Sequence, residues 1–178
     1  MRIIAGQYKG RYFSPDKYFK ARPTTDHARE GLFNILTNRC CFNNVSVLDL
    51  FAGTGAISFE FISRGVANVV AVESDNKHVG GIKKVATELG ISEELQIVRA
   101  DVFKYLAKCN SKYDVIFADP PYNIKNFDDI IDVVMRSDLL NEDGIFILEH
   151  PRGKEYSNVG HFEQMRRYGG VHFSIFTI

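Results

Sequence analysis

The chain has 178 residues, of which 45% are hydrophobic and 25% are charged, with 22 basic and 22 acidic side chains. This composition is ordinary for a globular protein and excludes collagen-like, coiled-coil and disordered classes, and the length suits a single domain, 1–178. No apolar stretch reaches the roughly 18 residues that a membrane span needs. The N-terminus lacks the apolar run of a signal peptide, and three cysteines form no paired framework, so we expect a reduced, cytoplasmic protein.

The charges are divided unevenly along the chain. Residues 1–39 carry eight Lys and Arg side chains against three Asp and Glu, a net charge of +5, so the remainder sums to −5. We therefore expect a basic N-terminal extension, 1–39, on an acidic body. Such a division indicates either a polyanion-binding edge beside a pocket for a cationic ligand, or simply an unevenly charged solvated surface.

The predicted elements begin with a short arm, Arg2–Phe13, that contains strand-like pieces, and a helix with good N-cap residues near Thr24-Thr25-Asp26. Apolar, β-branched runs then alternate with amphipathic segments, which is typical of βαβ units and of a mostly parallel sheet with helices on both faces. The last two runs flank Gly169-Gly170 and indicate an antiparallel hairpin. The predicted strands are Val45–Leu50, Asn68–Glu73, Leu95–Ala100, Tyr113–Ala118, Ile145–Glu149, Phe162–Tyr168 and Val171–Ile178. The predicted helices between them are Ala56–Ser63, Asn76–Leu89, Val102–Lys108 and Phe127–Arg136.

A glycine-containing turn, Phe51-Ala52-Gly53-Thr54-Gly55, follows the first of these long strands. Glycines permit a tight turn and let a ligand approach the backbone, and the N-terminus of the next helix supplies free N–H groups. A pyrophosphate-binding turn would carry a third glycine, but Ser58 stands there. Many strand–helix turns contain glycine for steric reasons only, so this turn alone is a weak indication of a cofactor.

Acidic residues at the ends of four successive strands strengthen the indication of a cofactor pocket: Asp49, Glu73, Asp101 and Asp119. Because parallel strands end at the same edge of the sheet, we expect these carboxylates to form one rim, where open α/β sheets bind ligands. Glu73 also lies 20 positions after Gly53, the spacing at which an acid commonly binds ribose hydroxyls. Such a rim disfavours a pyrophosphate, and S-adenosylmethionine, with its sulfonium, ammonium and ribose diol, fits it.

The motif Asp119-Pro120-Pro121-Tyr122 follows the fourth strand of the alternating series. Asp-Pro alone would be merely a strand stop, but here the Asp119 carboxylate and the Pro120 carbonyl could accept both hydrogens of an exocyclic base amine. Tyr122 could stack on the base. The pattern therefore predicts in-line methyl transfer to an amine, driven by positioning and charge placement, with Asp119 mainly an orienting acceptor.

The sequence resembles class I S-adenosylmethionine-dependent methyltransferases, and more narrowly the bacterial RsmD-type small-subunit rRNA guanine-N2 methyltransferases. The resemblance covers nearly the whole chain. Its motifs are the opening block from Arg2 to Arg11, the block Arg22-Pro23-Thr24-Thr25-Asp26 with Arg29-Glu30-Gly31-Leu32-Phe33-Asn34, the Asp49–Gly55 loop and Asp119–Tyr122. The first two blocks are the more specific, because many methyltransferases share the other two.

The resemblance implies a Rossmann-like, seven-stranded sheet with a terminal antiparallel hairpin, and methylation of guanine N2 in 16S rRNA. It also implies a cofactor site in which Asp49 through Gly55 hold the methionine moiety and Glu73, beside Ser74, holds the ribose. In the same site Asp101 with Val102 would hold the adenine, and Arg22 and Thr24 would line the near wall.

The basic arm then has a proposed role in RNA binding. Arg2, Lys9 and Arg11 could contact phosphates, and Tyr8 could stack on an unpaired base. The arm could instead pack on the sheet with its charges outward. We expect a monomer whose partner is 16S rRNA or the small ribosomal subunit, and a target guanine that is unpaired or flipped out.

Three other functions remain open from the sequence. A DNA adenine-N6 or cytosine-N4 methyltransferase would share Asp-Pro-Pro-Tyr, but the chain is short and has no separate target-recognition domain. An NAD-type dehydrogenase would need the missing third glycine, and a non-catalytic RNA-binding module would not need the acidic rim. The histidines and cysteines show no metal-ligand spacing, so we expect no metal.

Overall fold

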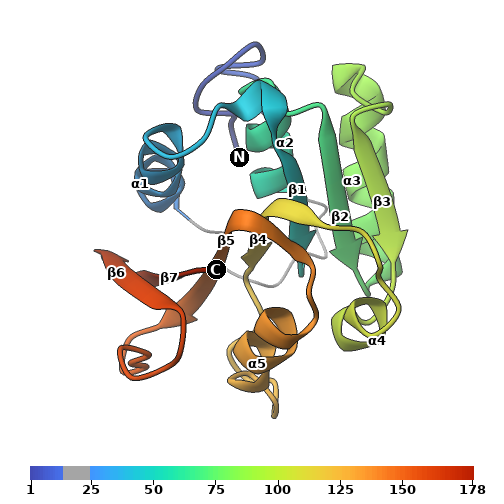
Figure 1. Cartoon of the computed structure of the whole chain (residues 1–178). Coiled ribbons are helices and arrows are strands. Elements are labelled where there is room, and N and C mark those ends of the chain that lie inside the picture. Colours follow the sequence, from blue (N-terminus) through green and yellow to red (C-terminus); the bar gives the residue numbers. More distant parts are fainter. Residues whose placement is uncertain (14–24) are drawn as a thin grey trace.

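The computed structural model describes residues 1–13 and 25–178, in which seven strands form one sheet surrounded by helices (Figure 1). The strands are β1 (Ser46–Leu50), β2 (Asn68–Glu73), β3 (Leu95–Arg99), β4 (Tyr113–Ala118), β5 (Leu140–Pro151), β6 (Phe162–Tyr168) and β7 (Val171–Thr177). The helices are α1 (Asp26–Thr37), α2 (Ala56–Ser63), α3 (Asn76–Leu89), α4 (Val102–Leu106) and α5 (Asp129–Arg136), with a short 3₁₀ helix at Phe42–Asn44.

The sheet has the strand order β3-β2-β1-β4-β5-β7-β6. Strands β1 to β5 pair in parallel, and β7 runs antiparallel to both β5 and β6. The predicted α/β fold and its C-terminal hairpin are therefore confirmed. The hairpin lies with β7 against the parallel strands and β6 at the edge, so β7 alone runs against the other six.

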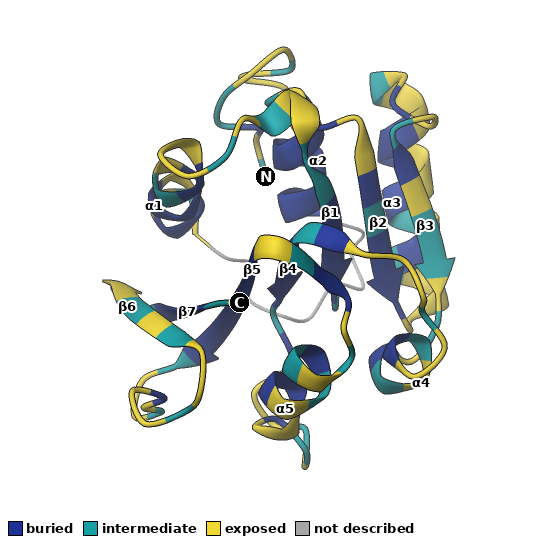
Figure 2. Cartoon of the chain, in the orientation of Figure 1, coloured by how far each residue is buried: buried dark blue, intermediate teal, exposed yellow. Residues whose placement is uncertain are grey.

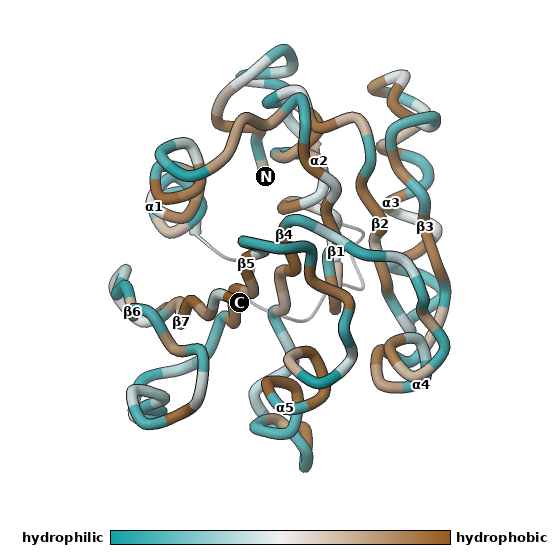
Figure 3. Tube along the Cα trace, in the orientation of Figure 1, coloured by the Kyte–Doolittle hydropathy of each residue, from teal (hydrophilic) through white to brown (hydrophobic). Residues whose placement is uncertain are grey.

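Both faces of the central strands β1, β2, β4 and β5 are mainly buried, which explains why these strands are rich in apolar residues, whereas the edge strand β6 is intermediate or exposed throughout (Figures 2 and 3). One hydrophobic cluster joins α1, α2 and α3 to alternate strand residues such as Val47, Phe117 and Ile147. A second cluster joins α4 and α5 to the intervening residues, such as Leu48, Ile116 and Phe146. Because side chains alternate along a strand, these clusters define which face each strand-end residue points to.

Local sequence signals set the ends of the main helices. The Thr25 side chain caps α1 by accepting a hydrogen bond from the Ala28 amide, as the N-cap prediction required. Asp75 caps α3 in the same way by accepting from the Lys77 and His78 amides. At the other end of α3, Gly90 adopts the left-handed conformation typical of a C-terminal glycine.

The N-terminal arm, residues 1–13, is anchored to α2 rather than extended into solvent. Buried Glu60 accepts hydrogen bonds from the Ile4 and Ala5 amides at 2.8 and 3.0 Å. The C-terminal end of α2 contacts the arm at Gly6, where a Cβ atom would lie 1.8 Å from the Ser63 carbonyl oxygen. Since α2 starts at the carboxyl edge of the sheet and runs back, this contact places that part of the arm at the opposite, amino-terminal edge (Figure 1).

We predict that Glu60→Ala lowers the free energy of unfolding by about 2–4 kcal/mol, measured by urea denaturation. The substitution leaves two arm amides without their acceptor and removes the carboxylate that accepts from the Arg64 guanidinium at 2.9 Å. The control is Glu88→Ala on the exposed side of α3, which should change stability by less than about 0.5 kcal/mol. Equal losses for the two variants would contradict the anchoring role.

Candidate active site

The turn between β1 and α2 has the backbone geometry of a ligand cradle. Phe51, Gly53 and Gly55 all have positive φ angles, of 61°, 55° and 77°. A Cβ atom on Gly55 would lie 2.9 Å from the Phe59 ring, so this position requires glycine for space as well as for conformation. No side chain caps the first turn of α2 within the described part of the chain, and its N–H groups face the carboxyl edge of the sheet.

Glu73 joins this turn to the next strand–helix connection. Its Oε2 accepts a hydrogen bond from the Gly53 amide at 2.8 Å, and its Oε1 accepts one from the Asp75 amide at 2.7 Å. Both hydrogen bonds come from backbone amides, and neither involves a positively charged side chain. Together they fix the Glu73 carboxylate at the rim. Oε2 has a second lone pair, so Glu73 keeps acceptor capacity for a ligand hydroxyl.

Asp49 lies beneath the turn and is only 1% exposed. Its Oδ2 accepts a hydrogen bond from the Ser58 hydroxyl at 2.5 Å. The pKa of Asp49 is raised to about 7, mainly by burial and less by the negative charge of Glu73, against the opposing effect of the bonds from Ser58. A cationic group bound beside Asp49 would favour the ionised carboxylate, which makes this position suited to an ammonium or a sulfonium.

The Asp119-Pro120-Pro121-Tyr122 motif begins where β4 ends, next to the end of β1. The Asp119 amide donates to the Leu50 carbonyl at 3.4 Å, and the Ile124 amide donates to the Pro121 carbonyl at 3.0 Å, which closes the turn. Burial raises the pKa of Asp119 well above its ordinary value, and the charges of Glu149 and Asp49 raise it further. Tyr122 is 47% exposed, so one part of its ring is available to a ligand.

Glu149 is a site residue that the sequence analysis did not identify. It is 3% exposed, and its Oε1 accepts a hydrogen bond from the Tyr122 hydroxyl at 3.4 Å. In the β4–β5 register Ala118 pairs with Leu148, so Asp119 and Glu149 follow side by side. The signal was present in the sequence, since Glu149 ends a predicted strand as the four expected acids do.

The remaining residues of the expected cofactor pocket lie in three different settings. Asp101 is exposed and caps α4 by accepting from the Lys104 amide at 3.0 Å, whereas the Val102 side chain is buried in the core. Ser74 is exposed beside Glu73, to which its hydroxyl donates at 3.4 Å. Arg22 and Thr24 lie outside the described residues.

The end of the arm approaches the cofactor turn, because Phe13 packs on Phe59, whose ring lies beside Gly55. The turn of the arm lies at the other end of α2, where the Tyr8 amide donates to the Ser63 hydroxyl at 3.0 Å. Lys9 and Arg11 are exposed there. Arg2 is held by an ion pair with Asp26 at 2.9 Å, and Tyr8 is half-buried against the core. In the described part of the extension, Lys9 and Arg11 therefore lie away from the rim, and the RNA-binding role of the extension stays a prediction.

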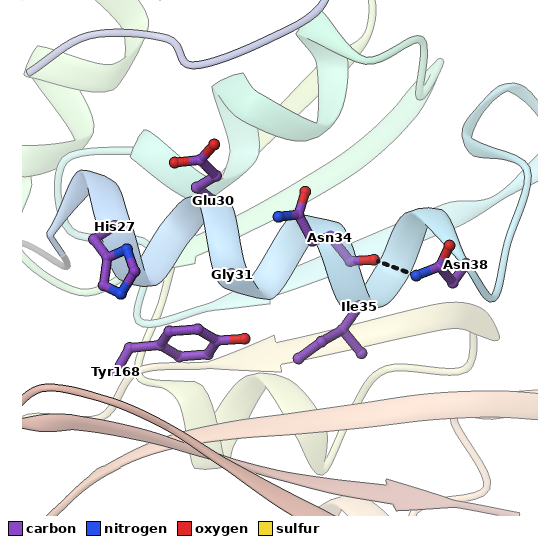
Figure 4. Close-up of a pocket in the computed structure, with 7 residues that line it drawn as sticks. All are labelled: His27, Glu30, Gly31, Asn34, Ile35, Asn38 and Tyr168. Atoms are coloured by element: carbon purple, nitrogen blue, oxygen red, sulfur yellow. Dashed lines mark hydrogen bonds between the residues drawn. The ribbon is translucent and has the colours of Figure 1, made fainter.

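Two open grooves lie away from the centre of the rim. One groove, of about 470 Å³, lies between α1 and β6, and Figure 4 shows Tyr168 and His27 on its wall. It is lined by His27, Glu30, Gly31, Asn34, Ile35, Asn38 and Tyr168. The other, of about 490 Å³, lies along α4, beginning at Ala100, and includes Lys104 and Lys108.

Among residues 1–13 and 25–178, no group of three His, Cys, Asp or Glu side chains could hold a metal ion. Within the same ranges, no helix is both long and apolar enough to cross a membrane.

The family described as "Conserved hypothetical protein 95" matches residues 1–177. The chain belongs to this family. Ribosomal RNA small subunit methyltransferase D of Buchnera aphidicola subsp. Baizongia pistaciae is 30% identical over 149 residues, which are 84% of this chain and 75% of that protein. The predicted resemblance to RsmD-type methyltransferases is thereby confirmed.

Solved structures agree with the observed fold. A hypothetical protein of Thermus thermophilus superimposes with a TM-score of 0.88 at 25% identity, over 100% of this chain and 99% of that one. The T. thermophilus 16S rRNA N2 G1207 methyltransferase RsmC, solved with AdoMet and guanosine, superimposes with a TM-score of 0.69 at 21% identity. That match covers 89% of this chain and 44% of RsmC, and it shows the same fold.

We predict that Asp49→Asn stabilises the unliganded protein at high pH. Because the folded-state pKa of Asp49 is about 7, above the ordinary value of 3.8, the folded state binds this proton more tightly than the unfolded chain does. The wild type therefore loses stability as the pH rises from about 4 through 7, and the variant escapes that loss. At pH 8 urea denaturation should show the variant about 2–4 kcal/mol more stable than the wild type, with a smaller difference at pH 5.

The control for this prediction is Asp132→Asn, an exposed carboxylate on α5. Its difference from the wild type should be the same at both pH values. A difference between Asp49→Asn and wild type that does not grow with pH would contradict the assigned environment of Asp49.

Proposed function

We propose that this protein transfers a methyl group from S-adenosylmethionine to the exocyclic N2 amine of a guanine in small-subunit (16S) rRNA. The observation that carries the proposal is the position of Asp119-Pro120-Pro121-Tyr122 next to the Gly53–Gly55 turn, at the ends of two hydrogen-bonded strands. Methyl donor and amine would therefore meet at one edge of the sheet. Membership of the RsmD-type family supports the choice of rRNA and of guanine N2.

The rim fits the charge pattern of this cofactor. When bound, S-adenosylmethionine supplies a methyl group on a positively charged sulfur. Asp49 would face its ammonium and the N-terminus of α2 its carboxylate, along the turn from Phe51 and Ala52 to Thr54 and Gly55. Glu73 would accept the ribose hydroxyls beside Ser74. The backbone at Asp101 and Val102 would border the adenine, and Arg22 and Thr24 remain proposed for the near wall.

The motif residues would hold the amine for attack. The Asp119 carboxylate and the Pro120 carbonyl accept the two N2 hydrogens, Pro121 keeps the turn stiff, and Tyr122 stacks on the base. The N2 lone pair forms the new N–C bond as the S–C bond breaks, and the sulfur keeps that electron pair. The amine then loses one proton to water or to Asp119. The positive sulfur favours ionised Asp119, which offsets the effect of burial.

A guanine inside a duplex could not bring N2 to this edge, so the target is unpaired or flipped out. We propose that the protein works as a monomer in the cytoplasm, on 16S rRNA or on the small ribosomal subunit. The direct test is transfer of labelled methyl groups to purified small-subunit rRNA and to duplex DNA, followed by mass spectrometry of the nucleosides. N2-methylguanosine in the rRNA is the expected product. Labelling of DNA alone would reject the proposal.

We predict that Asp119→Ala and Glu73→Ala separate turnover from cofactor binding. Asp119→Ala should lower kcat by about 10²-fold or more with nearly unchanged affinity for the cofactor, because an orienting acceptor for the amine is lost. Glu73→Ala should weaken cofactor binding first, because it removes the ribose acceptor and releases the Gly53 turn. Calorimetric titration with S-adenosylmethionine and single-turnover methylation measure the two effects. The opposite pattern would contradict both assignments.

We predict that the exposed arm residues contribute to RNA affinity through counterion release. The double variant Lys9→Ala, Arg11→Ala should weaken binding to small-subunit rRNA and reduce the slope of log affinity against log salt by about 1–2. The control is Lys83→Ala, Lys84→Ala, which removes the same charge from the exposed side of α3. Equal effects of the two double variants would show that the arm has no special role.

A further inference from the structure

We infer that Glu149 selects guanine by accepting a hydrogen bond from the base N1–H, beside the N2 amine that Asp119 holds. This inference rests on the proposed function and adds a residue that determines its specificity. The observation behind it is the placement of a buried carboxylate, Glu149, next to the Asp119-Pro120-Pro121-Tyr122 motif.

The strand register sets the spacing of the two carboxylates. Phe117 and Ile147 pair across β4 and β5 and both belong to the core on the α1–α3 face. Asp119 and Glu149 lie two residues further along their strands, so both point to that face. Neighbouring strands are about 4.8 Å apart, which gives two acceptors side by side at the edge of the sheet.

Guanine is the base whose Watson–Crick edge matches such a pair. It presents N1–H and the N2 amine as adjacent donors, so Asp119 and Glu149 can each accept one hydrogen from it. Adenine and cytosine also carry an exocyclic amine, but the ring nitrogen beside it is an acceptor in both. That nitrogen would turn a lone pair toward the Glu149 carboxylate, which is repulsive and leaves the buried acceptor without a donor from the base.

The contact with Tyr122 shows how the base could reach Glu149. The Tyr122 hydroxyl donates to Glu149 Oε1 at 3.4 Å, which is long for an O–H···O hydrogen bond. When the Tyr122 ring shifts to stack on a base, the N1–H of guanine can replace the hydroxyl at the same oxygen. One donor is thereby exchanged for another at this oxygen, and only a base that carries hydrogen on this nitrogen makes the exchange.

The test compares two target bases in otherwise identical RNA. Small-subunit rRNA is assembled by splinted ligation with guanosine or 2,6-diaminopurine riboside at the modified position found by nucleoside mapping. Diaminopurine keeps the 2-amine but has a lone pair at N1. Wild-type protein should prefer guanine by about 10²-fold or more in kcat/KM. Glu149→Gln should reduce the preference to below about 10-fold, because an amide can accept from N1–H or donate to the N1 lone pair.

Three further variants make the result specific to Glu149. Glu149→Asp keeps the charge and should keep a preference for guanine with a lower kcat/KM. This variant is the test of the role of Glu149 if Glu149→Gln does not fold. Tyr122→Phe removes the hydroxyl and should keep the preference for guanine. If this variant lost the preference, Glu149 would act only by holding Tyr122. Glu155→Gln, an exposed residue after β5, should match the wild type.

The possible failures are distinguishable. If wild-type protein does not methylate the guanine RNA, the proposed function fails. If it does, but wild type and Glu149→Gln discriminate equally between the two bases, the proposed function stands and the inference on Glu149 is overturned. A wild type that methylates both bases at similar rates would overturn it as well.

Discussion

The parallel register of the central strands is the constraint on which the site depends. Asp49 pairs with Ala71 on one side and with Phe117 on the other, and Phe117 pairs with Ile147. The next inward-facing positions along the neighbouring strands are Glu73, Asp119 and Glu149, so four carboxylates gather on one face at one edge. A slip of one residue in any of these pairings would turn an acid away from the site.

Like charges that lie close together in a protein interior destabilise the folded state, and in this fold the destabilisation arises at the acidic rim. The pKa values of Asp49 and Asp119 are raised by burial and by the neighbouring carboxylates. The two oxygens of Glu73 accept backbone amide hydrogen bonds from Gly53 and Asp75, which hold this carboxylate in place. The rim therefore contains an anchored carboxylate and others that favour protonation until a cation arrives, which is an arrangement suited to a sulfonium cofactor.

Much of the fold followed from local sequence, and the departures have physical causes. The apolar runs predicted the observed bounds of β2 and β4. Thr25 and Asp75 are the N-cap residues at which α1 and α3 start. The arm could not be placed in the same way, because its position depends on hydrogen bonds that its Ile4 and Ala5 amides donate to Glu60, more than 50 positions away in the sequence. Local patterns contain no information on such contacts.

The candidate site was predictable where a motif is contiguous and was missed where it is assembled by pairing. The Asp119–Tyr122 turn is visible as four adjacent letters. Glu149 ends a predicted strand, but its place beside Asp119 comes from the β4–β5 register and from its contact with the Tyr122 hydroxyl, neither of which the sequence displays. Asp101 shows the converse, since an acid at a strand end also serves as an ordinary helix cap.

The distance between the exposed arm residues Lys9 and Arg11 and the acidic rim has an electrostatic consequence. Helix α2 has eight residues and so spans about 12 Å between the cofactor turn at its start and the arm at its end. The exposed Lys9 and Arg11 are thereby kept apart from the rim carboxylates, with which they could otherwise pair. Placing Lys9 and Arg11 beyond the far end of α2 keeps them available for phosphates. A substrate that contacts both must be much larger than a nucleotide, which an rRNA is.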